Sequence, residues 1–242
     1  MRGELAQSAK RTRSLQGYRR KKALLFRMRL PMCLALIGAL ACGGPPPTKT
    51  APGPAPEPLA HALSGLAAQH VVVLPAYGVH VMPGLDWNSA IGRPADVART
   101  LDADILAALD ERGLRKTWIF PDQLVQSYRR NSAYATDPYG LAEEPLRAPG
   151  LSVDARLPEP LASQLRTLIA LHEDARLVLA PVDLRFEKAG TGGRGVLRLV
   201  LIDPRYSTVS WVGEISSDAQ PAFGPAISAG IAAQLANVVS VP

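Results

Sequence analysis

The stretch Leu177-Val-Leu-Ala-Pro-Val-Asp-Leu-Arg-Phe-Glu187 decides the fold of this chain. It is a predicted strand whose second half alternates with a period of two, so Val182, Leu184 and Phe186 are expected on one face. Further strands follow it directly. The stretch therefore predicts that the C-terminal part of the chain is built around a β-sheet.

Two more strands come next without an intervening helix. The first spans 196–202 after the turn Thr191-Gly-Gly-Arg-Gly195, and the second carries Val209, Trp211 and Ile215 in alternation. The glycine-rich turn leads into a strand and not into a helix, so it is a hairpin connection rather than a phosphate-binding loop. Three successive strands imply an antiparallel meander.

Helices are predicted on both sides of this meander in the sequence. The clearest begins at Pro94, and Gly113 is placed to cap its C-terminus. Asp102 and Asp104 are expected on its solvent face. Its apolar residues recur at a strict four-residue spacing: Val97, Leu101, Ile105 and Leu109. Shorter helices are expected over 57–69, 121–128, 159–172 and 221–238.

Two short apolar runs complete the predicted sheet. Val71-Val-Val-Leu-Pro75 is typical of a strand buried on both faces and ended by proline, and Thr117-Trp-Ile-Phe120 is a second short strand. The segments 77–93 and 131–157 show no periodicity and are expected to be irregular. The sequence thus predicts a single α/β domain: a mixed sheet of about five strands, partly parallel and partly an antiparallel meander, packed by helices.

The first 41 residues have the three-part order of a signal peptide. A basic stretch precedes an apolar run from Leu30 to Ala41, which ends in small residues suited to cleavage. The run is about a dozen residues long, whereas a membrane-spanning helix needs roughly 20. We therefore expect a cleaved leader. Met28 followed by Arg29 makes a compact basic region, and we expect Met28 to be the true start.

Cleavage after Ala41 would leave Cys42 as the first mature residue. This resembles a lipobox, where bacterial lipoproteins receive a diacylglyceryl group, although Ala39 and Leu40 stand in the reverse of the usual order. The alternative is that Cys42 is an incidental apolar residue. Residues 42–58 are rich in proline and alanine and indicate an extended tether, which leaves 59–242 as an α/β domain of the cell envelope. We expect a lipid-anchored protein facing the periplasm, at the outer membrane.

Charge and cysteine content exclude several classes of protein. Residues 1–41 hold ten of the 27 basic side chains and one of the 21 acidic ones, so the remainder has a net charge of about −3. The basic balance belongs to the leader, and nucleic acid is not an expected partner. The mature domain has no cysteine, so a disulfide framework or a cysteine metal site is not possible.

The order of elements resembles a known group of envelope domains. The group comprises the amino-terminal domain of the TolB translocation protein, the curli-secretion lipoprotein and the lipoprotein activators of penicillin-binding proteins. The resemblance covers roughly 70–238 and is carried by Val71–Pro75, by the Leu101–Gly113 helix with Trp118-Ile-Phe120, and by Leu199–Gly213. It implies an envelope domain and no particular partner. The 131–157 segment lacks the alternating pattern of the curli channel, which disfavours a pore.

No catalytic or metal-binding arrangement stands out from the sequence, and no cofactor is expected. Aromatic residues gather instead in or beside the two irregular segments, and exposed loop aromatics are favoured at protein interfaces. We expect Tyr77, Trp87, Tyr134 and Tyr139 to contribute to a partner-binding surface, with packing of loop over sheet as the alternative.

The expected function is a non-enzymatic, lipid-anchored envelope protein that binds another envelope protein through 77–93 and 131–157. A periplasmic enzyme, or a metal or small-ligand binder using His80 and Asp86, is the first alternative. A homo-oligomeric secretion component is the second. The sequence leaves the oligomeric state open.

Overall fold

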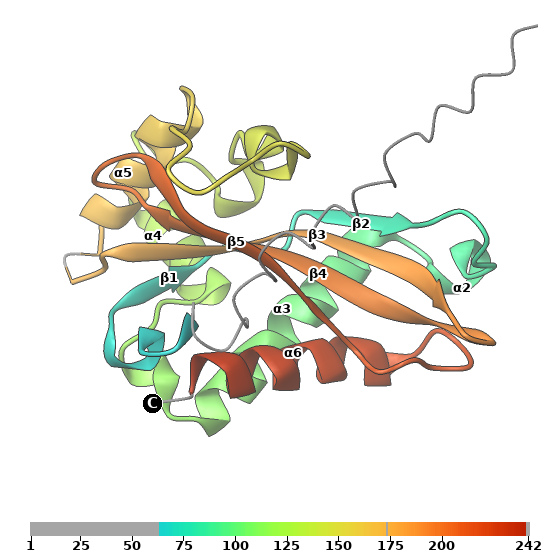
Figure 1. Cartoon of the computed structure of the whole chain (residues 1–242). Coiled ribbons are helices and arrows are strands. Elements are labelled where there is room, and N and C mark those ends of the chain that lie inside the picture. Colours follow the sequence, from blue (N-terminus) through green and yellow to red (C-terminus); the bar gives the residue numbers. More distant parts are fainter. Residues whose placement is uncertain (1–62, 173, 241–242) are drawn as a thin grey trace, which may run out of the picture. The chain divides into compact units, whose positions relative to one another are not determined.

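Five strands form one mixed sheet in the computed structural model, which describes residues 63–172 and 174–240 (Figure 1). The long strands β3 (Leu177–Ala189), β4 (Gly192–Asp203) and β5 (Thr208–Ser216) form an antiparallel meander. The short strands β1 (Val71–Val73) and β2 (Gly78–Val81) both pair in parallel with β3, one after the other along the same edge. The predicted α/β class and mixed sheet are confirmed.

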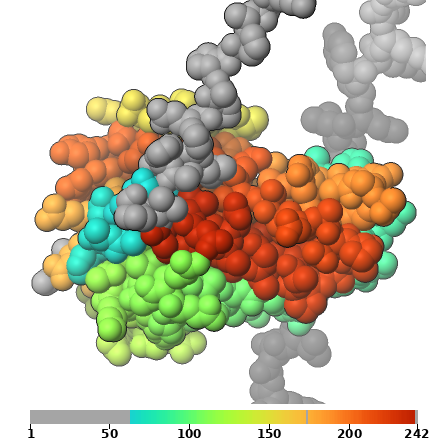
Figure 2. Space-filling model, turned by 60° about the horizontal axis from the view of Figure 1, so that its bottom comes forward, coloured from blue at the N-terminus to red at the C-terminus, as the bar shows by residue number. Residues whose placement is uncertain are grey.

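Helices cover both faces of the sheet. α3 (Pro94–Glu111) and α6 (Pro225–Val239) lie together on one face (Figure 1), and in Figure 2 the red α6 lies beside the green C-terminal part of α3. α5 (Leu161–Ala170) and the 131–157 segment cover part of the other face. The remaining helices are short: α2 (Asn88–Ile91), α4 (Pro121–Arg130), and the 3-10 helices η1 (Leu66–Ala68), η2 (Leu114–Lys116), η3 (Pro138–Gly140) and η4 (Glu144–Arg147).

The apolar spacing of α3 places its stripe in the core. Val97, Leu101, Ile105 and Leu109 are all buried, and Gly113 takes a left-handed φ of 77° directly after the helix, as predicted for its C-terminal cap. In α6, Ile227, Ile231 and Leu235 recur at the same four-residue spacing and are buried as well. Among the described residues, no helix combines the length and the apolar character that crossing a bilayer would need.

A β-bulge in β3 changes which side chains share a face of the sheet, in contrast to the prediction. The register with β4 shifts between Pro181 and Asp183, and such a shift moves the following side chains to the opposite face. Leu184 and Phe186 consequently pack against α3 and α6, whereas Val182 packs with the α5 core. The prediction that all three share one face was wrong.

The short elements also differ from prediction. The 77–93 segment was expected to be irregular, yet it contains β2 and α2. Thr117–Phe120 was expected to be a strand, but it makes only one isolated bridge, from Ile119 to Val72. Of the helix expected over 57–69, residues 66–68 form η1. The predicted leader (1–41), the tether (42–58) and Cys42 lie outside the described residues.

Candidate functional site

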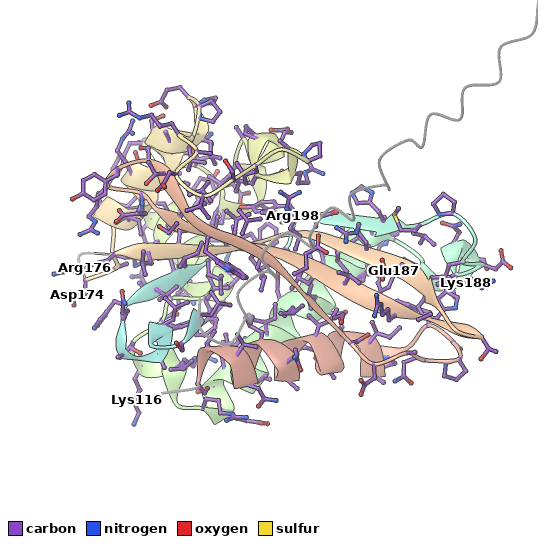
Figure 3. All side chains as sticks on the ribbon, in the orientation of Figure 1. Lys116, Asp174, Arg176, Glu187, Lys188 and Arg198 are labelled. Carbon is purple, nitrogen blue, oxygen red and sulfur yellow. The ribbon has the colours of Figure 1, made fainter. Side chains whose placement is uncertain are left out.

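The 131–157 segment is held firmly on the sheet. Arg198 of β4 (Figure 3) donates from its guanidinium to the carbonyl oxygens of Arg147 and Ala148, at 3.4 and 3.0 Å. Leu141, Leu146 and other apolar residues of the segment are buried in the core around α5. The segment is irregular, as predicted, but it forms part of the folded domain.

Tyr77 connects the two irregular segments. It lies in the connection between β1 and β2, packs against the α5 core, and donates from its hydroxyl to the carbonyl oxygen of Pro138 at 2.8 Å. Burial, together with the nearby carboxylates of Glu143 and Asp102, raises the pKa of Tyr77 well above its ordinary value. Tyr77 therefore stays protonated and acts as a hydrogen-bond donor between two segments that are remote in sequence.

Trp87 lies in the core instead of at the surface. Only 7% of it is exposed, and its ring packs against Phe186 and Phe223 with centroid distances of 6.1 and 6.0 Å. Phe223 in turn meets Phe186 edge to face. Trp87 was expected to contact a partner. It instead follows the stated alternative and packs the loop over the sheet.

Tyr134 and Tyr139 are the two predicted interface residues that are largely exposed. Tyr134 is 63% exposed, and its hydroxyl donates to the Asn131 side chain. Tyr139 is 44% exposed, and its hydroxyl donates to Oδ2 of Asp102 at 3.2 Å. Of the four aromatic residues expected at an interface, these two are placed to contact a partner.

Asp102 is a further residue that the sequence-based prediction placed wrongly. It was expected on the solvent face of α3, but it is only 8% exposed. Its Oδ1 accepts a hydrogen bond from the backbone N–H of Ala76 at 2.7 Å, in the connection between β1 and β2. The break between these strands leaves Ala76 N–H without a sheet partner, and Asp102 satisfies it.

Electrostatics around Asp102 favour its neutral form more than in an ordinary aspartate. Burial raises its pKa to about 6, and the hydrogen bonds from Ala76 and Tyr139 oppose the rise. Burial and the adjacent Asp102 carboxylate raise the pKa of Tyr139 to about 12, so it remains a donor. Within the described part of the chain, the donors that stabilise this carboxyl group are therefore both neutral.

Asp102 and Tyr139 line an open groove between α3 and α4, here called the α3–α4 groove. Its volume is about 390 Å³. Side chains from both helices and from η3 surround it, and they combine an apolar lining with a few charged or polar groups. They are Asp102, Ala103, Leu106, Pro121, Asp122, Val125, Gln126, Arg129 and Tyr139.

A second recess, with a volume of about 260 Å³, lies between α2, α3 and α6. It is lined mainly by apolar side chains, including Ile91, Phe186 and Phe223. Its one acidic side chain, Asp96, is paired with Arg93 at 2.7 Å. This recess therefore offers shape but no uncompensated charge to a ligand.

The alternative site at His80 takes a different form from the one expected. His80 lies on β2, and its Nε2 is 3.1 Å from Oδ1 of Asp183 on β3, whereas no ion pair with Asp86 is formed among the described residues. Within 63–172 and 174–240, no three His, Cys, Asp or Glu side chains gather closely enough to hold a metal ion. The structure pairs His80 with Asp183, and the metal- or ligand-binding alternative at His80 and Asp86 stays a prediction.

Comparison with known proteins gives similarity to solved structures. No protein-family model and no curated protein matches the sequence. The chain is similar to the PelC dodecamer from Paraburkholderia phytofirmans, at 13% identity over 72% of this chain and 89% of that chain, with a TM-score of 0.34. It is also similar to the lipoprotein GNA1162 from Neisseria meningitidis (18% identity, 65% and 81% covered, TM-score 0.30). A third similar structure is the LpoB C-terminal domain from Salmonella enterica (13% identity, 62% of this chain and 83% of that chain covered, TM-score 0.31). Similarities of this size assign neither a family nor a function to the chain.

Proposed function

We propose that this chain is an exported, lipid-anchored protein of the cell envelope that binds another envelope protein through the α3–α4 groove and the tyrosines beside it. The observation that carries the proposal is the position of Tyr139. Nearly half of its side chain is exposed at the groove, while its hydroxyl is fixed by the buried Asp102. An aromatic residue that is exposed yet held in place loses little conformational entropy on binding, which favours it as an interface anchor.

The surface around Tyr139 is preorganised from several sides. Tyr77 fixes Pro138, Arg198 fixes the far end of the same segment, and η3 itself is capped by the Asp137 side chain, which accepts from Tyr139 N–H at 3.0 Å. Because these contacts already exist in the unbound chain, a partner would not have to order the segment. This supports recognition of a protein surface.

The proposed localisation of the protein is based on its sequence. Export is favoured by the leader at 1–41. The lipobox-like Cys42 and the tether at 42–58 favour attachment to the outer membrane, with the folded domain facing the periplasm. A tether of this kind allows a folded domain to reach partners at some distance from the bilayer. The lipid would serve as an anchor and the domain as the binding module.

Affinity purification from detergent-solubilised envelopes tests the proposal. We expect the tagged wild-type chain to recover a specific protein whose yield falls at least tenfold in the double variant Tyr134→Ala/Tyr139→Ala. The matched control is Tyr206→Ala, which removes a tyrosine that is 70% exposed but lies outside both irregular segments. Equal recovery by all three proteins, with equal thermal stability, would contradict the proposed surface.

A further inference from the structure

Asp102 is a nearly buried carboxylate without a cationic partner. Its contacts in the described chain are the Ala76 N–H and the Tyr139 hydroxyl, and it forms no ion pair with a described Lys, Arg or His. Buried carboxylates in proteins are usually paired with a cation, because neutral donors replace only part of the lost hydration. The raised pKa of Asp102 reflects this incomplete compensation.

The α3–α4 groove leads from solvent to this carboxylate, and its lining suits a long basic side chain. Leu106, Pro121 and Val125 provide apolar surface for an aliphatic stem, in the manner of lysine and arginine stems that lie along apolar surfaces. The ring of Tyr139 borders the same space and can attract a cation by its face. The aliphatic stem of a basic residue would thus contact apolar side chains, and its cationic head would lie near the Asp102 carboxylate and the Tyr139 ring.

From this arrangement we infer that the α3–α4 groove binds an arginine or lysine side chain of the partner protein, with the cationic head at Asp102 and the stem on Leu106 and Val125. The inference rests on the proposed function and adds the chemistry of the partner, a basic segment. The charge complementarity comes from the uncompensated Asp102, and a second acidic residue of the groove, Asp122, is already paired with Arg115 at 3.1 Å.

Other charged and titratable groups lie around Asp102, and one of them opposes the binding of a cation. Arg129 is the one basic side chain among the residues that line the groove. It should weaken the binding of a second cation, so its removal should strengthen binding. The groups that face Asp102 and Tyr139 from the packed elements are Tyr77, Arg99, Asp122, Arg129, Asp137 and Glu143.

Proton linkage gives this binding a characteristic pH dependence. A cation binds the ionised carboxylate, and Asp102 ionises with a pKa of about 6 in the unbound chain. Affinity should therefore rise as the pH increases through this value and level off above it. Among the groups around Asp102, the pKa values of Tyr77 and Tyr139 are raised, so both stay neutral over this range, and burial raises the pKa of Glu143 above its ordinary value. A variant that lacks only the Asp102 carboxylate separates its contribution from that of Glu143.

The test uses two small probes and the purified chain. N-acetyl-arginine methylamide and its neutral isostere N-acetyl-citrulline methylamide are titrated by NMR between about pH 5 and about pH 8. We expect the arginine probe to shift signals of Asp102, Leu106 and Tyr139, and the citrulline probe to bind at least tenfold more weakly. Asp102→Asn should lower the affinity for arginine by about tenfold or more and flatten its pH profile, because a hydrogen-bonded charge pair is lost.

Three further variants keep the test decisive. Arg129→Gln should tighten the arginine probe several-fold, Ala103→Trp should block it by filling the groove from an exposed position, and Asp104→Asn on the same helix should leave it unchanged. Equal binding of both probes, no binding at any pH, or unaltered binding by Asp102→Asn would overturn the inference. A natural partner that binds the wild type and Asp102→Asn equally would overturn it too, while leaving the proposed function intact. If the chain bound the arginine probe selectively but recovered no partner, the inferred cation site would stand and the proposed function would be contradicted.

Discussion

The hydroxyl of Tyr77 donates a 2.8 Å hydrogen bond to the carbonyl oxygen of Pro138, a residue 61 positions further along the chain. This bond joins the connection between β1 and β2 to the segment that presents Tyr139. Pro138 is buried, so its carbonyl oxygen has little access to water as a replacement partner. The contact couples the sheet edge to the proposed binding surface.

Replacing Tyr77 with phenylalanine should therefore loosen the surface around η3. The variant keeps the ring but leaves the Pro138 carbonyl without its donor, which should cost about 1–2 kcal/mol in unfolding free energy. Amide hydrogen exchange over 131–140 should accelerate. The control is Tyr134→Phe, whose lost hydrogen bond to Asn131 is exposed and should cost less than about 0.5 kcal/mol. Equal exchange in both variants would contradict the coupling.

Asp102 should make stability depend on pH in an unusual direction. Its folded-state pKa is raised from 3.8 to about 6, so its stabilising contribution is fully present below the unfolded pKa and is lost as the pH rises through about 6. Asp102→Asn cannot ionise and avoids this loss. Relative to the wild type, it should gain up to about 3 kcal/mol in unfolding free energy between acidic and neutral pH.

Chemical denaturation at a series of pH values measures this difference. Asp104→Asn, on the same helix, should follow the wild-type curve in shape. A constant offset between Asp102→Asn and the wild type at every pH would show that the carboxyl group is not destabilised by its burial.

Trp87→Ala should cause a large loss of stability even though this residue lies in a segment expected to be irregular. Its ring packs against both Phe186 and Phe223 in the core, and truncating a buried aromatic residue costs about 3–5 kcal/mol. Tyr206→Ala should change the unfolding free energy by less than about 0.5 kcal/mol. Thermal denaturation of both variants distinguishes a core role for Trp87 from a surface role.

Cys42→Ala tests the proposed membrane anchor. Cells labelled with an alkyne fatty acid should transfer the label to the wild-type chain and not to the variant, because the acyl groups need the cysteine at the cleavage point. The variant should also move from the membrane fraction to the soluble fraction. Label retained by the alanine variant would contradict lipidation at Cys42.

Sequence periodicity was sufficient to predict the main elements of the fold. The four-residue spacing from Val97 to Leu109 predicted α3, and the apolar runs after Leu177 predicted the meander, because both patterns report burial of one face directly. β2 was missed because Gly78-Val-His-Val81 contains a glycine and a histidine instead of a continuous apolar run, and it forms a strand by pairing with β3. Such pairing depends on a partner that is remote in sequence.

The candidate site was less predictable for a similar reason. Tyr134 and Tyr139 were identified from their place in an irregular segment, but Asp102 was assigned to the solvent face because it is charged and lies outside the apolar stripe. Its burial depends on Ala76, whose N–H needs an acceptor only because β1 and β2 are interrupted opposite the bulge in β3. A local sequence window contains no sign of that requirement.

Site-specific photo-crosslinking in living cells tests the proposed binding surface most directly. A photoreactive phenylalanine analogue at position 139 should link the chain to one envelope protein, and the same analogue at position 206, a more exposed tyrosine site, should not. Introducing Asp102→Asn into the chain that carries the analogue at position 139 should reduce the crosslink if the partner inserts a basic side chain. Identical products from positions 139 and 206, or no product from position 139, would contradict a partner at the α3–α4 groove.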